Sequence, residues 1–298
     1  MPRIASCSTV FRNVPDFESF AAHMVEVLDH AAGADLVVLP ELVTFELMTA
    51  VPGWQDATDL QPAVRTADFA DRYREFMSAE ARRRQQHVLA GSHLVQTEDG
   101  RLLNVAPLFG PTGRLLHEHA KTHLFPLEFT LDIAEGDDMK VVDLPFARIG
   151  VNICYEAEIP ECSASLVEQG AHIILCPSLT LNEAGFWRVR HCLAARSIEN
   201  QVFTVHAGSA SPPRGPWPGT WAQSALLGPC DTRWPADGVL AQTPPNIDAV
   251  AIADLDLNHL EDNRSSGAAT TFADRRRRAD RYRAWPTHVT TASTPVHP

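Results

Sequence analysis

Short apolar runs alternate along this chain with longer segments in which apolar residues recur every three to four positions. The run 34–39 ends at Pro40 and predicts a buried strand, whereas 17–32 predicts a helix with Asp16 as N-cap and Gly33 as its stop. The same patterns predict helices at 67–86, 159–169 and 186–200, a hairpin of 102–109 with 114–119, and strands at 87–91, 141–144, 148–153, 172–176, 202–206, 224–227 and 250–255. This alternation favours a layered α/β fold.

The chain has 298 residues and shows neither an internal repeat nor a linker that would divide it. We therefore expect a single domain over residues 1–272, followed by an arginine-rich and flexible C-terminal tail over 273–298 that has least to bury from Thr287 onward. The segment 208–221 contains four prolines and three glycines and predicts a long irregular loop. Such loops in compact domains are often functional.

The charge balance and the cysteine pattern narrow the class of protein. A formal net charge of −12 argues against a nucleic-acid partner, and the basic run 275–278 with Arg281 and Arg283 is interpreted as a solvated or partner-facing segment. The N-terminus lacks a secretory apolar region, and no window approaches the roughly 18 apolar residues of a membrane span. Six scattered cysteines without a C-x-x-C pair argue against a zinc site or a disulfide framework, so we expect a cytoplasmic protein without a membrane partner.

Three expected strand ends carry side chains that packing alone would not select, namely Glu41, Lys121 and Cys154. Ligand sites in open α/β sheets form beyond the carboxyl ends of the strands. A thiol is a poor nucleophile until it is deprotonated, and a neighbouring base or cation favours the thiolate. The carboxylate can take that proton and the ammonium can stabilise an oxyanion. Taken singly, however, each residue has an ordinary interpretation as a helix-terminal charge, a solvated lysine or a core cysteine.

A second pattern offers a competing interpretation, because His117, His119, Lys121 and His123 alternate and so share one face of an extended strand. No Asp or Cys with ligand spacing accompanies these histidines, which favours surface or hydrogen-bonded roles, and no metal is expected. The loop 208–221 has no phosphate-binding spacing, so we expect no nucleotide site and no other cofactor.

The chain contains three stretches that resemble, in order, the three signatures of the nitrilase superfamily of carbon–nitrogen hydrolases: 34–41, 121–125 and 153–161. Members of this family use a Glu–Lys–Cys triad. Further similarity lies at 170–178, at Arg190, at 194–201 and at 253–257. The resemblance covers roughly residues 3–260. It implies a nitrilase-like α-β-β-α sandwich as a single domain, so that 1–272 is interpreted as a carbon–nitrogen hydrolase domain.

The resemblance also implies roles for individual residues. Glu41 would be the general base, Lys121 the oxyanion stabiliser and Cys154 the nucleophile on a strand-to-helix turn, with the Tyr155 backbone N–H as a second oxyanion donor. Glu128 would position the lysine. Two further residues, Arg196 and Glu199, match a buried structural ion pair.

The sequence departs from the family pattern beside the cysteine. Tyr155 favours amidase over nitrilase chemistry, whereas Glu156 stands where many amidase-like members have Asp. We predict hydrolysis of a small amide or carbamoyl substrate through a Cys thioester. The alternatives are a nitrilase, acyl transfer to an amine, or a catalytically silent binding or scaffold protein. The candidate substrate-pocket residues are Phe45, Glu156, Ser178, Trp187 and Trp217.

The resemblance, together with the helix 159–169, predicts a homodimer or a higher homo-oligomer. The alanine, serine and leucine positions of that helix suit packing against a partner copy, and the arginine-rich tail could then lie across a neighbouring subunit.

Overall fold

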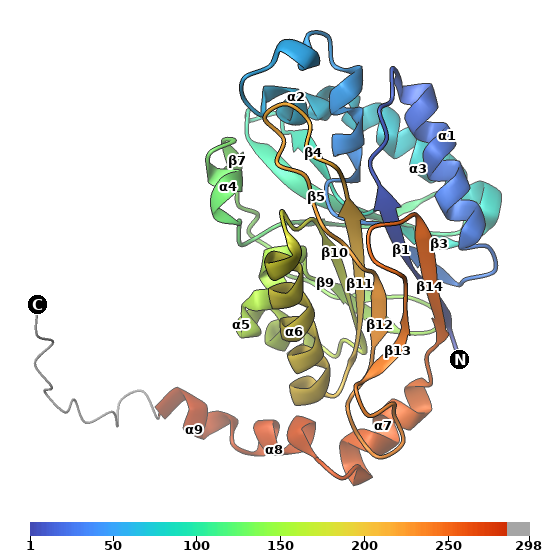
Figure 1. Cartoon of the computed structure of the whole chain (residues 1–298). Helices are drawn as coiled ribbons and strands as arrows, with labels where there is room; N and C mark the ends of the chain where they lie inside the picture. The colour runs from blue at the N-terminus through green and yellow to red at the C-terminus, as the bar shows by residue number, and fades with distance from the viewer. Residues whose placement is uncertain (285–298) are drawn as a thin grey trace, which may run out of the picture.

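The computed structural model describes residues 1–284, which form helices around strands that belong to one curled sheet (Figure 1). The strands are β1 (Arg3–Val10), β2 (Leu36–Val38), β3 (His87–Leu89), β4 (His93–Gln96), β5 (Leu102–Phe109), β6 (Leu115–Ala120), β7 (Ile133–Ala134), β8 (Val142–Asp143), β9 (Arg148–Val151), β10 (Ile173–Ser178), β11 (Phe203–Ala210), β12 (Ala225–Leu227), β13 (Val239–Gln242) and β14 (Ala249–Asp254). Their main order is β4-β5-β3-β2-β1-β11-β10-β9-β8, and β1 is parallel to both β2 and β11.

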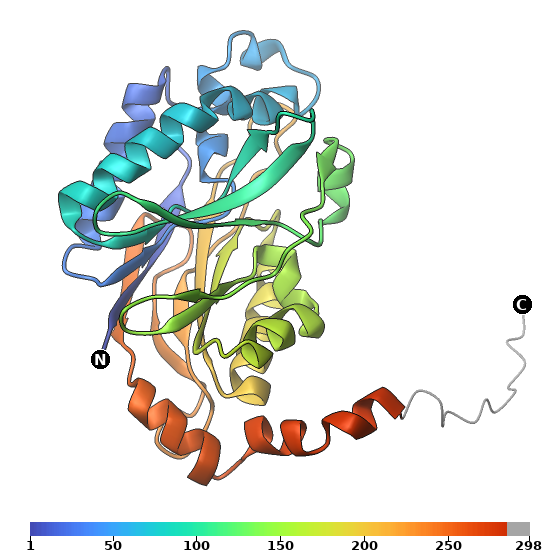
Figure 2. The same cartoon turned by 180° about the vertical axis from the view of Figure 1, so that it is seen from behind.

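The longer helices cover the outer faces of this sheet. The α-helices are α1 (Phe17–His30), α2 (Gln61–Val64), α3 (Ala70–Arg84), α4 (Pro126–Phe129), α5 (Pro160–Glu168), α6 (Glu183–Asn200), α7 (Leu257–Ser266), α8 (Thr271–Arg277) and α9 (Ala279–Ala284). The 3₁₀ helices are η1 (Val43–Ala50), η2 (Trp54–Asp56), η3 (Arg65–Phe69) and η4 (Cys154–Glu158). Figures 1 and 2 show α1 and α3 on one side of the strands and α5 and α6 on the other.

Alternation along β1 explains this layering. Ile4 joins the main core between the two halves of the sheet, together with residues of β9, β10 and β11. Its neighbour Ala5, and Cys7 two residues on, belong instead to the core beneath α1 and α3. Successive side chains of a strand point to opposite faces, so one strand can serve both cores. The predicted α-β-β-α sandwich is therefore confirmed.

Local signals place most elements close to their predicted bounds. The Asp16 carboxylate accepts the Ser19 N–H at 2.8 Å and caps α1, and Gly33 adopts a φ of 80° just beyond the helix. The hairpin forms as β5 and β6. The helix predicted at 67–86 begins instead as a 3₁₀ turn, since η3 precedes α3. The predicted loop 208–221 is partly regular, because β11 continues to Ala210.

The arginine run 275–278 lies in and just after α8, which packs on the body of the protein. The Phe272 ring of α8 lies between the guanidinium groups of Arg264 and Arg276, at 4.2 and 3.5 Å from the ring centre. Arg275 donates to the Asn200 side chain at 2.5 Å. Figure 1 shows α9 projecting away from the sheet. The stretch from Thr287 lies outside the described residues, and the boundary between 272 and 273 stays a prediction.

The packing argument for a partner at α5 is wrong. Ala164 and Leu166 are buried within the chain itself, and Ser163 donates to the Asn152 side chain at 2.7 Å. These small and apolar positions therefore serve the internal core, and the expected homo-oligomer stays a prediction without this support. Within residues 1–284, no helix combines the length and apolar character needed to cross a membrane.

Gly91 allows two backbone segments to pass very close together where the chain leaves β2 towards Glu41. Gly91 has a φ of 57°, and a Cβ added there would lie 1.9 Å from the Pro40 carbonyl oxygen. The next residue, Ser92, donates its N–H to that same oxygen at 3.1 Å. Only a residue without a side chain permits this close approach of two backbones.

We expect Gly91→Ala to destabilise the protein more than Gly100→Ala. Gly100 also has a positive φ but nothing within 4 Å of an added Cβ, so its replacement reports backbone strain alone. That strain is about 1–2 kcal/mol, and each kcal/mol corresponds to ~2–4 °C in Tm for a large domain. Thermal unfolding of both variants measures the difference. Equal shifts in Tm would show that the contact with Pro40 relaxes without cost.

Candidate active site

Glu41 lies just beyond β2 in a turn held by Ser92. The Ser92 hydroxyl accepts the Leu42 N–H at 2.9 Å, and Leu42 itself adopts a left-handed φ of 46°. A left-handed conformation is costly for a leucine and persists only where surrounding contacts enforce it. The result is a carboxylate that is 2% exposed and directed towards the ends of β6 and β10.

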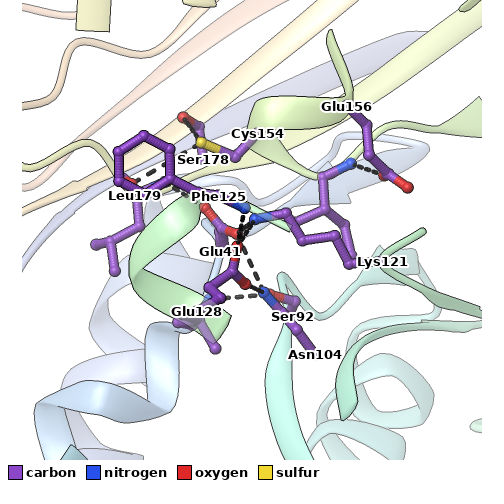
Figure 3. A network of polar contacts seen from close by, with 12 residues as sticks. Glu41, Ser92, Asn104, Lys121, Phe125, Glu128, Cys154, Glu156, Ser178 and Leu179 are labelled. Atoms are coloured by element: carbon purple, nitrogen blue, oxygen red, sulfur yellow. Dashed lines mark hydrogen bonds and ion pairs between the residues drawn. The ribbon is translucent and has the colours of Figure 1, made fainter. Parts of the chain in front are cut away.

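The Lys121 ammonium lies between two carboxylates at the end of β6 (Figure 3). Its Nζ donates to Glu41 Oε1 at 2.8 Å and to Glu128 Oε2. The Asn104 amide bridges the same carboxylates, because its Nδ2 donates to Glu41 at 3.1 Å and to Glu128 at 2.9 Å. Lys121 is 1% exposed, so these contacts replace the hydration that burial removed.

Cys154 begins η4, three residues after the last residue of β9, at a φ of 47°. This left-handed residue makes a sharp turn from strand to helix, as the sequence predicted. The thiol accepts the Ser178 hydroxyl at 3.3 Å and lies 3.8 Å from the Leu179 carbonyl oxygen. The Leu179 N–H donates to Glu41 Oε2 at 2.8 Å, so the end of β10 contacts both the thiol and the carboxylate.

The three ionisable groups shift one another strongly. Burial raises the pKa of Glu41; the Lys121 ammonium opposes this and the Glu128 charge adds to it, leaving the pKa above its ordinary value. Burial disfavours the Lys121 ammonium, but Glu41 and Glu128 outweigh it and raise the lysine pKa. Burial and the Glu41 charge raise the pKa of Cys154 beyond what Lys121 offsets. The resting thiol is therefore neutral. The Glu41 charge raises the thiol pKa more than the Lys121 charge lowers it.

These groups line one cavity of about 160 Å³. Phe45 and Trp217 pack edge-to-face in its wall, with ring centres 5.7 Å apart, and Tyr155 lines it near the thiol. Arg188 and Glu158, paired at 2.7 Å, are charged members of the lining. The remaining lining is largely apolar: Leu42, Phe125, Leu127, Leu131, Leu179, Thr180, Leu181, Asn182, Gly185 and Val189.

Three pocket predictions need correction. Trp187 is 41% exposed, stacks on His191 and does not line the cavity, because its position on α6 faces outward. Glu156 is fully buried and faces away from the cavity, since the 3₁₀ turn after Cys154 directs it towards β6. Ser178 contacts the thiol but does not line the cavity.

Two further predictions concern the ion pair on α6 and the alternating histidines in and after β6. The pair of Arg196 and Glu199 forms at 2.7 Å, but only the arginine is buried, since the Glu199 side chain is 39% exposed. Among the alternating histidines, His119 donates to Glu156 at 2.8 Å. Within residues 1–284 no group of three or more His, Cys, Asp or Glu side chains is placed to hold a metal ion.

Sequence reasoning missed Asn104 and the Leu179 N–H. Asn104 is 0% exposed within the apolar run of β5, and a polar residue in such a run was its only signal. The backbone N–H of Leu179 carries no side-chain signal at all. Both groups bind Glu41, so its carboxylate has three donors, the Lys121 ammonium, the Asn104 amide and the Leu179 N–H, of which the motifs supplied only the first.

The carbon–nitrogen hydrolase family model matches residues 3–264, and the chain belongs to this family. A relative, the probable hydrolase YhcX of Bacillus subtilis (strain 168), is 32% identical over 284 residues, which cover 92% of this chain and 54% of YhcX. The chain thus spans about half the length of that relative. The chloroplastic omega-amidase of Arabidopsis thaliana is 26% identical, over 88% of this chain and 69% of its own length.

Solved structures support the same fold. Nit3 of Saccharomyces cerevisiae, described as a member of branch 10 of the nitrilase superfamily, matches with a TM-score of 0.72 at 19% identity, over 89% of this chain and 93% of Nit3. A double mutant of the amidase from Nesterenkonia sp. AN1, in complex with acrylamide, matches with a TM-score of 0.70 at 21% identity, over 95% and 97% of the two chains. At these identities the comparison concerns the fold alone.

We expect the pH dependence of Cys154 alkylation to separate Glu41→Gln from Lys121→Met. Removing the Glu41 charge lowers the thiol pKa, so the alkylation midpoint moves to lower pH, whereas removing the Lys121 charge moves it higher. Iodoacetamide labelling across a pH series, read by peptide mass spectrometry, gives both midpoints. The exposed Cys230 provides an internal control within each sample. Shifts in the same direction for both variants would contradict this charge assignment.

Proposed function

We propose that this protein hydrolyses the carbon–nitrogen bond of a small amide through a thioester on Cys154. The observation that carries the proposal is the convergence of a buried thiol, a carboxylate and an ammonium on one cavity, with Glu41 bound directly to Lys121 at 2.8 Å. Thiol, base and cation are the complete set that acyl transfer through sulfur requires. Membership of the carbon–nitrogen hydrolase family supports the same chemistry.

The proposed cycle begins with a neutral thiol. Glu41 takes the Cys154 proton as the sulfur attacks the carbonyl carbon, and the raised pKa of Glu41 suits it to return that proton to the departing nitrogen. The C–N bond breaks, ammonia or an amine leaves, and a thioester remains. Water then attacks the thioester while Glu41 accepts its proton. The C–S bond breaks, the carboxylic acid leaves and the sulfur regains a proton from Glu41.

Two donors would stabilise the tetrahedral oxyanion. Lys121 Nζ already binds two carboxylates and lines the cavity beside the thiol. The Tyr155 N–H donates no backbone or side-chain hydrogen bond within residues 1–284, which leaves it free for a substrate oxygen. Removing one preorganised oxyanion donor typically costs about 10²–10³ in kcat.

The cavity lining favours a small substrate with an apolar acyl group. Phe45, Trp217 and several leucines supply an apolar wall, while polar groups concentrate around Cys154. Relatives named omega-amidases and a fold neighbour solved with acrylamide make an amide the first substrate class to test. Carbamoyl compounds fit the same attack on a carbonyl carbon.

Three alternatives share this site. A nitrile would react through a thioimidate, and acyl transfer would replace water by an amine; neither changes the first attack by Cys154. A silent binding or scaffold protein would bind a ligand in the cavity without turnover. Matched amide and nitrile substrates distinguish an amidase from a nitrilase. Added amines reveal acyl transfer. An absence of ammonia release from every substrate of the panel would favour a binding or scaffold protein.

We expect Cys154→Ala to abolish ammonia release while the protein stays folded. Alanine removes the nucleophile from a site whose other contacts remain, and losses of nucleophiles are typically larger than about 10³-fold. The assay is ammonia release from a panel of small amides, ureas and nitriles, with thermal unfolding to check the fold.

Cys7→Ala is the matched control, because Cys7 is also buried, belongs to the core beneath α1 and α3 and does not line the cavity. We expect it to keep turnover within a few-fold of wild type. Residual activity of Cys154→Ala above about 1% of wild type would remove the nucleophile from the mechanism.

A further inference from the structure

Glu156 lies two residues after Cys154, and its position in the sequence predicts a place in the substrate pocket. Its side chain instead binds backbone and side-chain donors outside the cavity. Its carboxylate is 0% exposed, and Figure 3 shows it apart from the side chains of Glu41 and Cys154. It accepts four donors: the Ile153 N–H at 2.6 Å, the Thr122 N–H at 2.7 Å, the Thr122 hydroxyl at 2.6 Å and His119 Nε2 at 2.8 Å. Three of these donors belong to the chain neighbours of Cys154 and Lys121, and His119 lies two residues before Lys121.

These donors come from two segments that are distant in sequence. Ile153 immediately precedes Cys154, and Thr122 immediately follows Lys121. One carboxylate therefore ties the backbone before the nucleophile to the backbone after the cation. The backbone of Lys121 is also held by β5, because its N–H donates to the Asn104 carbonyl oxygen at 2.9 Å.

We propose that Glu156 is a positioning residue, whose carboxylate fixes the turn bearing Cys154 against the segment bearing Lys121. The proposal rests on the function proposed above. Glu156 does not touch the cavity and takes no proton in the reaction. It acts by setting the separation between thiol and ammonium, and a misplacement near 1 Å at such a site can cost about 10²-fold in rate.

The turn at Cys154 needs firm contacts, and the donors around Glu156 require a carboxylate there instead of an amide. Cys154 holds a left-handed φ of 47°, a strained state that surrounding contacts must enforce. Both oxygens of Glu156 already face N–H donors, Thr122 on one side and Ile153 on the other. A glutamine would direct its own NH₂ at one of them, leaving two donors opposed in a buried site.

The charge is also maintained by its surroundings. Burial alone would raise the pKa of Glu156, but His119 and the Thr122 contacts outweigh burial and hold the pKa below its ordinary value. The carboxylate thus stays ionised and remains an acceptor for all four donors at neutral pH. An aspartate would keep the charge, but its side chain is shorter. It would bind either the Ile153 segment or the Thr122 segment well, and not both.

The test compares Glu156→Gln with Glu46→Gln in the full-length protein. Glu46 is also 0% exposed and is bound by a histidine, His23, at 2.8 Å, yet it contacts neither Lys121 nor Cys154 and does not line the cavity. We expect both variants to lose thermal stability. Only Glu156→Gln should lower kcat, by about 10²-fold with KM within threefold, because the substrate cavity stays intact.

A second readout needs no substrate. The alkylation rate of Cys154 and its pH midpoint depend on the distances of Glu41 and Lys121 from the thiol, so Glu156→Gln should shift that midpoint while Glu46→Gln should not. If wild type releases no ammonia, the proposed function fails, but this readout still tests Glu156. Glu156→Asp should recover part of kcat and part of the midpoint.

Thr122→Val provides a milder variant should Glu156→Gln not fold. It removes one hydroxyl donor and keeps the Thr122 N–H, so we expect a loss of kcat of about threefold to tenfold without a change in KM. The proposal is overturned if Glu156→Gln and Thr122→Val keep both kcat and the alkylation midpoint of wild type. It is equally overturned if Glu46→Gln reproduces the effects of Glu156→Gln, since the role would then be general stability.

Discussion

A buried ammonium between two carboxylates is the interaction on which the rest of this site depends. An uncompensated charge in a protein interior costs several kcal/mol, so Lys121 is tolerable only while Glu41 and Glu128 both contact it. This requirement brings together the end of β2, the end of β6 and the short helix α4. Two carboxylates against one ammonium leave an excess negative charge, and the Asn104 amide spreads its donors over both.

Burial and these charges together decide where the protons of the site lie. Burial is the largest cause that raises the pKa of Glu41, and the Glu128 charge adds to it. Burial and then the Glu41 charge raise the pKa of the Cys154 thiol, so the resting site keeps its proton on sulfur. A neutral thiol is protected from unwanted alkylation, and in the proposed cycle its proton moves to Glu41 only as the sulfur attacks a substrate carbon. The same arrangement makes the geometry between Cys154 and Lys121 critical. The Glu156 carboxylate accepts both the Ile153 N–H, just before Cys154, and the Thr122 N–H, just after Lys121.

The sequence predicted the features that depend on local signals. Apolar periodicity and the Asp16 cap are local, so the layers and α1 emerged correctly, and motifs at strand ends identified Glu41, Lys121 and Cys154 as residues of one cavity. Side-chain direction after a turn is not local. The 3₁₀ turn η4 directs Glu156 towards β6 and out of the cavity lining, and the register of α6 directs Trp187 outward. Asn104 was missed because its partners come from elements 24 and 63 residues away.

The central claim is that Cys154 carries the acyl group during turnover. Acid quenching of wild type during reaction with an amide that it hydrolyses, followed by peptide mass spectrometry, tests this directly. The account predicts an acyl mass on the peptide containing Cys154, removable by hydroxylamine and absent from Cys154→Ala. Turnover without that adduct, or an acyl group on any of the other five cysteines, would contradict the account.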